Sequence, residues 1–335
     1  MIKEAIAKVV ERIDLTAEEM TAAFDEIFEG QATPAQIAAL ITAMRMKGET
    51  IEEITACAKS MRAHALPINA EGDLLEIVGT GGDCARTFNI STTSAFVIAA
   101  AGIPVAKHGN RSVSSKSGAA DVLEALGANL MLEPEQALAQ LKASNMVFLF
   151  AQKYHGAMRY AGPVRGQTGI RTVFNILGPL TNPAKANLQV MGVYDEKLVL
   201  PLAQVLQKLG VKRGIVVNGA GLDELSLTGM NHIAEIKEDG TISCYDLDAT
   251  TLGLAPCTRE DIEGGFGPDN AVITEAILSG KGTKAQRETV LLNAGAGIYV
   301  GGKAKSIAEG IEIAAEVIAS GKALQAMRKF VQMSL

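Results

Sequence analysis

Apolar residues in the first 66 positions recur at the spacing of a helix, and no stretch there alternates as a strand would. Hydroxyl residues that stand three positions before Glu or Gln form capping boxes, which mark helix starts. The pairs are Thr16 with Glu19, Thr33 with Gln36, and Thr50 with Glu53. The pattern predicts a small helical bundle. We place its border in the short segment 67–72, which gives domains 1–70 and 71–335.

From Leu74 onward, short apolar runs alternate with longer segments of helical spacing. This alternation predicts an α/β domain with a central, mostly parallel sheet surrounded by helices. An Asp239-Gly240 pair between two short apolar runs predicts a hairpin. Ala-rich segments after 268 predict further helices. We expect strands at 74–78, 103–106, 147–150, 188–193 and 214–217, and helices at 91–101, 117–126, 198–209, 270–279, 284–298 and 304–319.

Composition limits the function. Hydrophobic residues make up 48% of the chain and charged residues 20%, so a large core is expected. The net charge of −6 argues against a general nucleic-acid binder, which needs a basic face. Four scattered Cys residues without a CxxC motif are typical of a reduced cytosolic protein. The first 15 residues are charged and amphipathic, unlike an export signal, and no apolar run spans a membrane. We expect a cytoplasmic protein.

A glycine-rich turn, Gly79–Asp83 (GTGGD), follows the first predicted strand. Small residues between a strand and a helix let bare backbone N–H groups approach an anion. The turn is not a P-loop, because no GKS or GKT follows it. It is not a GxGxxG motif either, because the third glycine is missing. Asp83 beside such amides suits a metal ion or ribose hydroxyls; a plain tight turn capped by Asp83 is an equally good interpretation. The Asn, Ser and Thr of 89–92 either cap the next helix or face the same anion.

A second turn, 107–121 (KHGNRSVSSKSGAAD), follows another predicted strand. Amides, hydroxyls and cationic groups together suit a diphosphate. A solvated charged face fits this stretch poorly, because it lies between a buried strand and an apolar helix. Ligands of parallel sheets bind beyond the carboxyl ends of the strands, where both turns fall. The pair of turns therefore predicts a ligand with more than one phosphate.

Two further features suggest partners for such a ligand. Asp223 and Glu224 follow the predicted strand 214–217, where they could hold Mg²⁺ or be ordinary surface charge. Arg165 and Arg171 flank Gly166–Gly169 and precede the largely apolar run 174–183 (FNILGPLTNP), which we expect to shape a pocket. An Arg beside an apolar pocket suits a planar ligand with a carboxylate.

Taken together and in this order, GTGGD, KHGNRSVSSKSG, FNILGPLTNP and the Asp223-Glu224 pair resemble the anthranilate phosphoribosyltransferase family. The likeness covers essentially the whole chain, including the N-terminal helices. It implies transfer of the 5-phosphoribosyl group from phosphoribosyl diphosphate to the amine of anthranilate, the second step of tryptophan biosynthesis. It also implies Mg²⁺, a small helical domain beside a larger α/β domain, and a homodimer that forms through the helical domain.

The resemblance assigns roles residue by residue. Lys107 would act electrostatically, and no general acid or base is implied. Arg165 would meet the anthranilate carboxylate beside Gly79 and Asn110, with His108 and His155 as secondary candidates for the aromatic pocket. The Mg²⁺ ligands would be Ser91, Asp223 and Glu224. The phosphoribosyl diphosphate site would comprise Gly79, Gly82, Asp83, Thr87, Asn89, Ile90, Ser91, Thr92, Lys107, His108, Gly109, Asn110, Arg111, Ser112, Val113, Ser114, Ser115 and Ala119. Ala119 departs from the family pattern, where a Ser is expected, so only its backbone amide could contribute.

Two other functions stay open from the residues alone. A pyrimidine nucleoside phosphorylase shares this architecture and also binds an anion near ribose C1. The KHGNR stretch and the 174–183 run favour the transferase. A nucleic-acid-binding relative without transferase activity is the second alternative, and the acidic charge balance and the intact Asp223-Glu224 pair speak against it.

Overall fold

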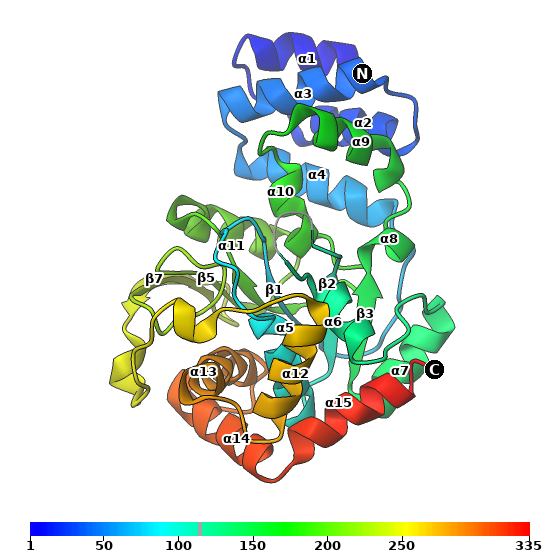
Figure 1. Cartoon of the computed structure of the whole chain (residues 1–335). Helices are drawn as coiled ribbons and strands as arrows, with labels where there is room; N and C mark the ends of the chain where they lie inside the picture. The colour runs from blue at the N-terminus through cyan, green and yellow to red at the C-terminus, as the bar shows by residue number, and fades with distance from the viewer. Residues whose placement is uncertain (113–115) are drawn as a thin grey trace.

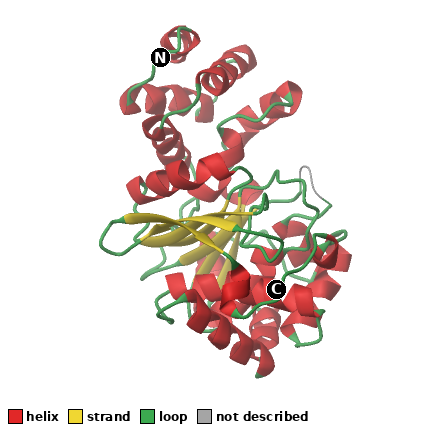
Figure 2. Cartoon of the chain, turned by 90° about the vertical axis from the view of Figure 1, so that its left-hand side faces the viewer, coloured by secondary structure: helices red, strands yellow, loops and turns green. Residues whose placement is uncertain are grey.

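The computed structural model describes residues 1–112 and 116–335. Its N-terminal layer is a bundle in which every predicted capping box is present. The bundle lies over one face of a sheet, and further helices cover the opposite face (Figures 1 and 2). The bundle helices are α1 (Ile2–Val10), α2 (Ala17–Phe28), α3 (Pro34–Lys47) and α4 (Ile51–Ala63).

The sheet has seven strands in the order β3-β2-β1-β4-β5-β6-β7. The five strands from β3 to β5 in this order are parallel, and β6 and β7 add an antiparallel hairpin at one edge. The predicted mostly parallel sheet is therefore confirmed, as is the hairpin around Asp239-Gly240, where Gly240 adopts φ +83°. The strands are β1 (Leu75–Gly79), β2 (Val105–Gly109), β3 (Met146–Phe150), β4 (Leu188–Gly192), β5 (Arg213–Gly219), β6 (Asn231–Ile236) and β7 (Ile242–Leu247).

Alternating strand residues pack into hydrophobic cores on both faces of the sheet. Ile215 and Val217 of β5 pack with helices α5 and α13, whereas Val216 between them packs with α11 and the bundle. This is the period of two that buries both faces of a parallel sheet. The helices of this domain are α5 (Ile90–Ala100), α6 (Ala119–Ala125), α7 (Pro134–Ser144), α11 (Val199–Lys208), α12 (Gly267–Leu278), α13 (Lys284–Val300), α14 (Ile307–Ala319) and α15 (Lys322–Gln332), with 3₁₀ turns η1 (Gly178–Leu180), η2 (Glu196–Leu198), η3 (Ala249–Leu252) and η4 (Glu260–Ile262).

Three helices lie between β3 and β4, and the last two of them pack against the bundle, whereas the first packs against β3. They are α8 (Ala151–Tyr154), α9 (Met158–Thr168) and α10 (Phe174–Leu177). Ala161 and Val164 of α9 share a core with α3, and Figure 1 shows α9 beside α2 and α3. The division of the chain at residue 70 stays a prediction. The packing of α9 shows that a segment after residue 70 also belongs to the helical layer. Across the described ranges, no helix is long and apolar enough to cross a bilayer.

Glycines at two neighbouring strand ends let the loop after β5 lie directly on the sheet. A Cβ on Gly192, at the end of β4, would stand 1.6 Å from the carbonyl oxygen of Asp223. A Cβ on Gly79, at the end of β1, would stand 2.1 Å from Oδ2 of the same residue. Such contacts are impossible for any residue with a side chain unless the loop moves. These glycines therefore fix the height of Asp223 above the strand ends.

We expect Gly192→Ala to lower the free energy of unfolding by about 1–3 kcal/mol, because the new methyl group meets backbone that cannot yield cheaply. Gly162→Ala is the matched control, since Gly162 lies inside α9 with open space around it. Ala there should be neutral or slightly stabilising. Urea unfolding of both variants measures the difference, and equal stabilities would show that the 222–224 loop is not pressed onto β4.

Candidate active site

The two predicted turns begin at adjacent strands, β1 and β2, and so lie at the same edge of the sheet. The first turn is joined to the loop after β5. Gly81 N donates to Oδ2 of Asp223 at 2.6 Å, and Asp223 N donates to Oδ2 of Asp83 at 3.5 Å. Gly81 and Gly82 adopt φ +72° and +81°, a conformation that favours glycine. The structure thus brings GTGGD and the Asp223-Glu224 pair together.

Lys107 lies beneath this edge, where β1 and β2 part. In the described residues the ladder between these strands pairs Leu75 with Val105 and goes no further, whereas β1 pairs with β4 along its full length. The buried Lys107 reaches into the gap, and its Nζ donates to Ile77 O at 2.6 Å and to Ser91 Oγ at 3.1 Å. Burial lowers the pKa of Lys107, and the carboxylates of Glu224, Glu76 and Asp223 oppose that shift.

Glu76 fills the same gap from the other face of the sheet. Its Oε1 accepts from His108 N at 3.1 Å, while Oε2 has no hydrogen-bond partner in the described part of the chain. Burial raises the pKa of Glu76. Sequence reasoning missed Glu76; its one signal was a carboxylate inside an otherwise apolar strand.

The start of α5 joins the two turns to each other. Ser91 N donates to Oε1 of Glu224 at 3.2 Å. The Asn89 amide donates to Ser117 O and accepts from Ser117 Oγ, so α5 is linked to the end of the second turn. The N-terminal amides of α5 therefore face the edge at which both turns meet, where a helix dipole favours an anion. Ile90 and Thr92 are buried, so their side chains belong to the core and only their backbone could contribute.

Residues of the second turn divide into several groups. Gly109 ends β2, and Asn110 is exposed at the edge. Arg111 is paired with Glu124 and Asp121 and lies over the Phe150 ring, so its charge is already directed at neighbours. Val113, Ser114 and Ser115 lie outside the described residues. Three other predicted members remain. Ser112 N donates to Asp121, and Thr87 forms a β-bridge with Glu263. Ala119 is the first residue of α6.

The carboxylates at this edge suit a hydrated divalent cation. Burial and the nearby Asp83 raise the pKa of Asp223 well above its usual range, and burial raises the pKa of Glu224 against the pull of Lys107. Ionising these two carboxyl groups is therefore costly, and a bound cation would lower that cost. No group of three or more His, Cys, Asp or Glu side chains forms a ready cage within residues 1–112 and 116–335. Mg²⁺ does not need one, because it keeps several waters and binds through one or two carboxylates plus phosphate oxygens.

Arg165 lies apart from the strand ends, on α9. Its half-buried guanidinium stands 5.4 Å from the centre of the Phe174 ring, and burial lowers its pKa. No carboxylate pairs with it in the described chain, so it is a cation without an anion. The segment after α9 returns to the first turn through Arg171, which sequence reasoning did not assign. Arg171 donates to Gly82 O and lies over the Tyr194 ring.

His108 and His155 form a buried pair with ring centres 4.9 Å apart. Burial lowers the pKa of His108 to about 3 and that of His155 to about 4, so both rings are neutral at pH 7. His108 Nδ1 faces Gly178 O, which places its ring hydrogen on that nitrogen. Nε2 of His108 is then a bare acceptor, and it has no partner among the described residues.

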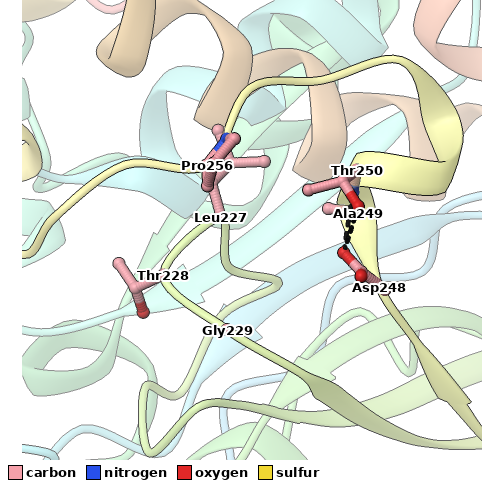
Figure 3. Close-up of a pocket in the computed structure, with 7 residues that line it drawn as sticks. All are labelled: Leu227, Thr228, Gly229, Asp248, Ala249, Thr250 and Pro256. Carbon is pink, nitrogen blue, oxygen red and sulfur yellow. Dashed lines mark hydrogen bonds between the residues drawn. The ribbon is translucent and has the colours of Figure 1, made fainter.

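A separate hollow of about 240 Å³ lies near the β6–β7 hairpin and contains none of the predicted site residues. Figure 3 shows its lining, in which Asp248, the one ionisable side chain, accepts from the backbone of Thr250. This hollow offers no chemistry comparable to that of the strand ends.

Comparison with known proteins shows the family to which the chain belongs. Residues 3–65 match the helical bundle domain of the glycosyl transferase family, and residues 71–324 match its a/b domain. Proteins named anthranilate phosphoribosyltransferase match over nearly all of both chains. One from Methanobrevibacter smithii is 54% identical over 99% of each chain, and one from Geobacter sulfurreducens is 51% identical over 100% of this chain and 99% of its own.

Solved structures agree with these sequence matches. Anthranilate phosphoribosyltransferase (TrpD) from Thermus thermophilus superposes with a TM-score of 0.94 at 41% identity, over 98% of each chain. The enzyme from Saccharomyces cerevisiae in complex with PRPP and Mg gives 0.92 at 26% identity, over 99% of this chain and 97% of its own. Neither the phosphorylase nor the nucleic-acid-binding alternative is favoured by these matches. The chain therefore belongs to the anthranilate phosphoribosyltransferase family.

Proposed function

We propose that this chain transfers the 5-phosphoribosyl group from phosphoribosyl diphosphate to the amine of anthranilate. The products are N-(5-phosphoribosyl)anthranilate and diphosphate, in the second step of tryptophan biosynthesis. The observation that carries the proposal is the meeting of two glycine-bearing turns, the start of α5 and a carboxylate pair above the buried Lys107. The named function of the relatives supports it.

Leaving-group stabilisation is the main task of the site. The lone pair of the neutral aromatic amine attacks ribose C1, the bond from C1 to the diphosphate oxygen breaks, and diphosphate departs with the electron pair. The amine then loses a proton to solvent. Lys107 and the amides of the first turn and of α5 hold the charge that develops on diphosphate. Catalysis thus needs positioning and electrostatics, and no general base.

Magnesium would be held by Asp223, Glu224 and Ser91, and when bound it neutralises charge on the diphosphate. The yeast enzyme was solved in complex with PRPP and Mg, which supports magnesium as the metal. The chain also meets the two carboxylates with donors of its own. Asp223 takes a hydrogen bond from Gly81, and Glu224 takes one from Ser91.

The aromatic substrate would lie between Arg165 and the strand ends. Arg165 would bind its carboxylate, because this guanidinium is half-buried beside Phe174 without an anion in the described chain. Gly79 and Asn110 would contact the anthranilate from the side of the sheet. The neutral His108 and His155 would border the ring without adding charge.

A homodimer formed through the helical bundle, in a cytoplasmic setting, completes the proposal. Val10, Ile13 and Met46 are exposed apolar residues of the bundle that such an interface would cover. In this arrangement residues 1–70 would provide the dimer contact and part of the aromatic site, and residues 71–335 would bind phosphoribosyl diphosphate.

The direct test follows anthranilate fluorescence, which falls as the amine is substituted. We expect loss of fluorescence only when phosphoribosyl diphosphate and Mg²⁺ are both present. A parallel reaction with thymidine and phosphate should give no product. Phosphorolysis of thymidine without consumption of anthranilate would replace this proposal with the phosphorylase.

Removing both site carboxylate charges, Asp223→Asn with Glu224→Gln, should lower kcat by about 100-fold or more. The Mg²⁺ concentration for half-maximal rate should also rise, because the anionic oxygens that hold the cation are lost. The matched control is Glu238→Gln with Asp239→Asn, an adjacent pair in the hairpin turn away from the site. A magnesium titration that is the same in both double variants would remove Asp223 and Glu224 from the metal site.

Arg165→Ala should raise KM for anthranilate by roughly 10- to 100-fold, the worth of one buried charge-assisted hydrogen bond. KM for phosphoribosyl diphosphate should change little. Arg159→Ala on the same helix is the control, because Arg159 lies exposed on the Tyr160 ring. Steady-state kinetics with each substrate varied separately will decide. If both KM values rise equally in Arg165→Ala, the residue is structural.

A further inference from the structure

Four consecutive backbone carbonyls, those of residues 178–181, each accept a hydrogen bond from a side chain of a different element. We call them the carbonyl row. The hydrogen bonds are His108 Nδ1 to Gly178 O at 3.1 Å, Gln189 Nε2 to Pro179 O at 2.7 Å, Arg62 Nε to Leu180 O at 2.8 Å, and His155 Nε2 to Thr181 O at 2.9 Å. The donors come from β2, β4, α4 and the turn after α8.

Gln189 is the least expected of these donors. It occupies the middle of the sheet, where its partners in register on the adjacent strands are Glu76 and Gly214. A buried amide there is costly unless it is hydrogen-bonded. Its Nε2 bonds the Pro179 carbonyl, a group that no regular ladder could satisfy. The hydrogen bond to the carbonyl row therefore accounts for a polar side chain at position 189.

Arg62 links the row to two other parts of the chain. Its Nε binds Leu180 O, and its NH1 donates to Leu209 O at 3.2 Å, at the end of α11. Because Arg62 belongs to α4, the bundle and the sheet domain are hydrogen-bonded to the same short segment.

The row contacts residues that the proposed function places around the aromatic acid. The segment that contains it begins at Phe174, under the Arg165 guanidinium, and ends at Thr181, beside His155. His108 joins it to the second turn. A change in the row would therefore reach the residues proposed to contact the aromatic acid directly.

Backbone carbonyl oxygens carry partial negative charge and repel a carboxylate when they are bare. Here each one is covered by an N–H donor. Resting on the proposed function, we propose that Gln189 and Arg62 are positioning residues for the aromatic acid. They hold the carbonyls of Pro179 and Leu180 away from the pocket, so that this wall presents no negative edge to an anionic ring.

The test is Gln189→Leu, matched with Gln140→Leu. Both glutamines are 1% exposed, and Gln140 Nε2 binds a comparable carbonyl, that of Phe330, at 3.0 Å, in the contact between α7 and α15. Each variant strands one carbonyl and should lose similar stability in urea unfolding. Gln189→Leu alone should raise KM for anthranilate, by about 10-fold, with KM for phosphoribosyl diphosphate changed less than about 2-fold. If Gln189 had only a structural role, KM for anthranilate would change equally in the two variants.

Equal KM values for anthranilate in the two variants overturn the inference, as does an equal rise for both substrates in Gln189→Leu. If Gln189→Leu does not fold, Arg62→Lys provides the second measurement. It keeps the charge but cannot reach both Leu180 O and Leu209 O, and should show the same selective rise. Wild-type protein that fails to consume anthranilate would overturn the proposed function itself. If the wild type is active but the variants show no selective rise in KM for anthranilate, only the role of the row is overturned.

Discussion

A buried ammonium in the gap between two parted strands is the constraint on which the site depends. Lys107 cannot leave this gap without stranding Ile77 O, and it binds Ser91 at the start of α5 at the same time. One cation therefore fixes the distance between β1, β2 and α5. Burying an unpaired charge is costly, and the nearby carboxylates of Glu76 and Glu224 offset part of that cost. The arrangement explains why both turns open at the same point.

The positive and negative groups at this edge of the sheet do not neutralise one another. Glu224 is drawn toward Lys107, whereas Asp223 and Asp83 approach each other closely enough to disfavour ionisation of Asp223. A diphosphate and a divalent cation bring two charges of opposite sign, so they could satisfy the lysine and the carboxylates together. The chain's own donors to the two carboxylates are the backbone amides of Gly81 and Ser91. Strain of this kind is typical of a site built for a charged ligand.

Much of the fold could be predicted from the sequence, because its signals are local. Capping boxes locate α2, α3 and α4, and apolar runs locate the strands. Helix α9 could not be predicted this way, because it is polar overall, contains Pro163 and depends on packing against α2 and α3. Helices α7 and α15 were also missed. The site shows the same limit: glycine-rich turns stand out in the sequence, whereas the pairing of Arg111 with Glu124 depends on contacts across the fold.

The chain between β3 and β4 explains how a helical layer can serve a site at the edge of a sheet. It leaves β3, crosses to the bundle with Arg165 on α9, and returns through the carbonyl row to β4. On this return the row is held from both sides, by Arg62 of the bundle and by His108 and Gln189 of the sheet. Arg165 is not held from both sides in this way. Its helix, α9, packs against the bundle helices α2 and α3. A shift of the bundle against the sheet would therefore have to break the Arg62 hydrogen bond to the row, whereas Arg165 could move with the bundle.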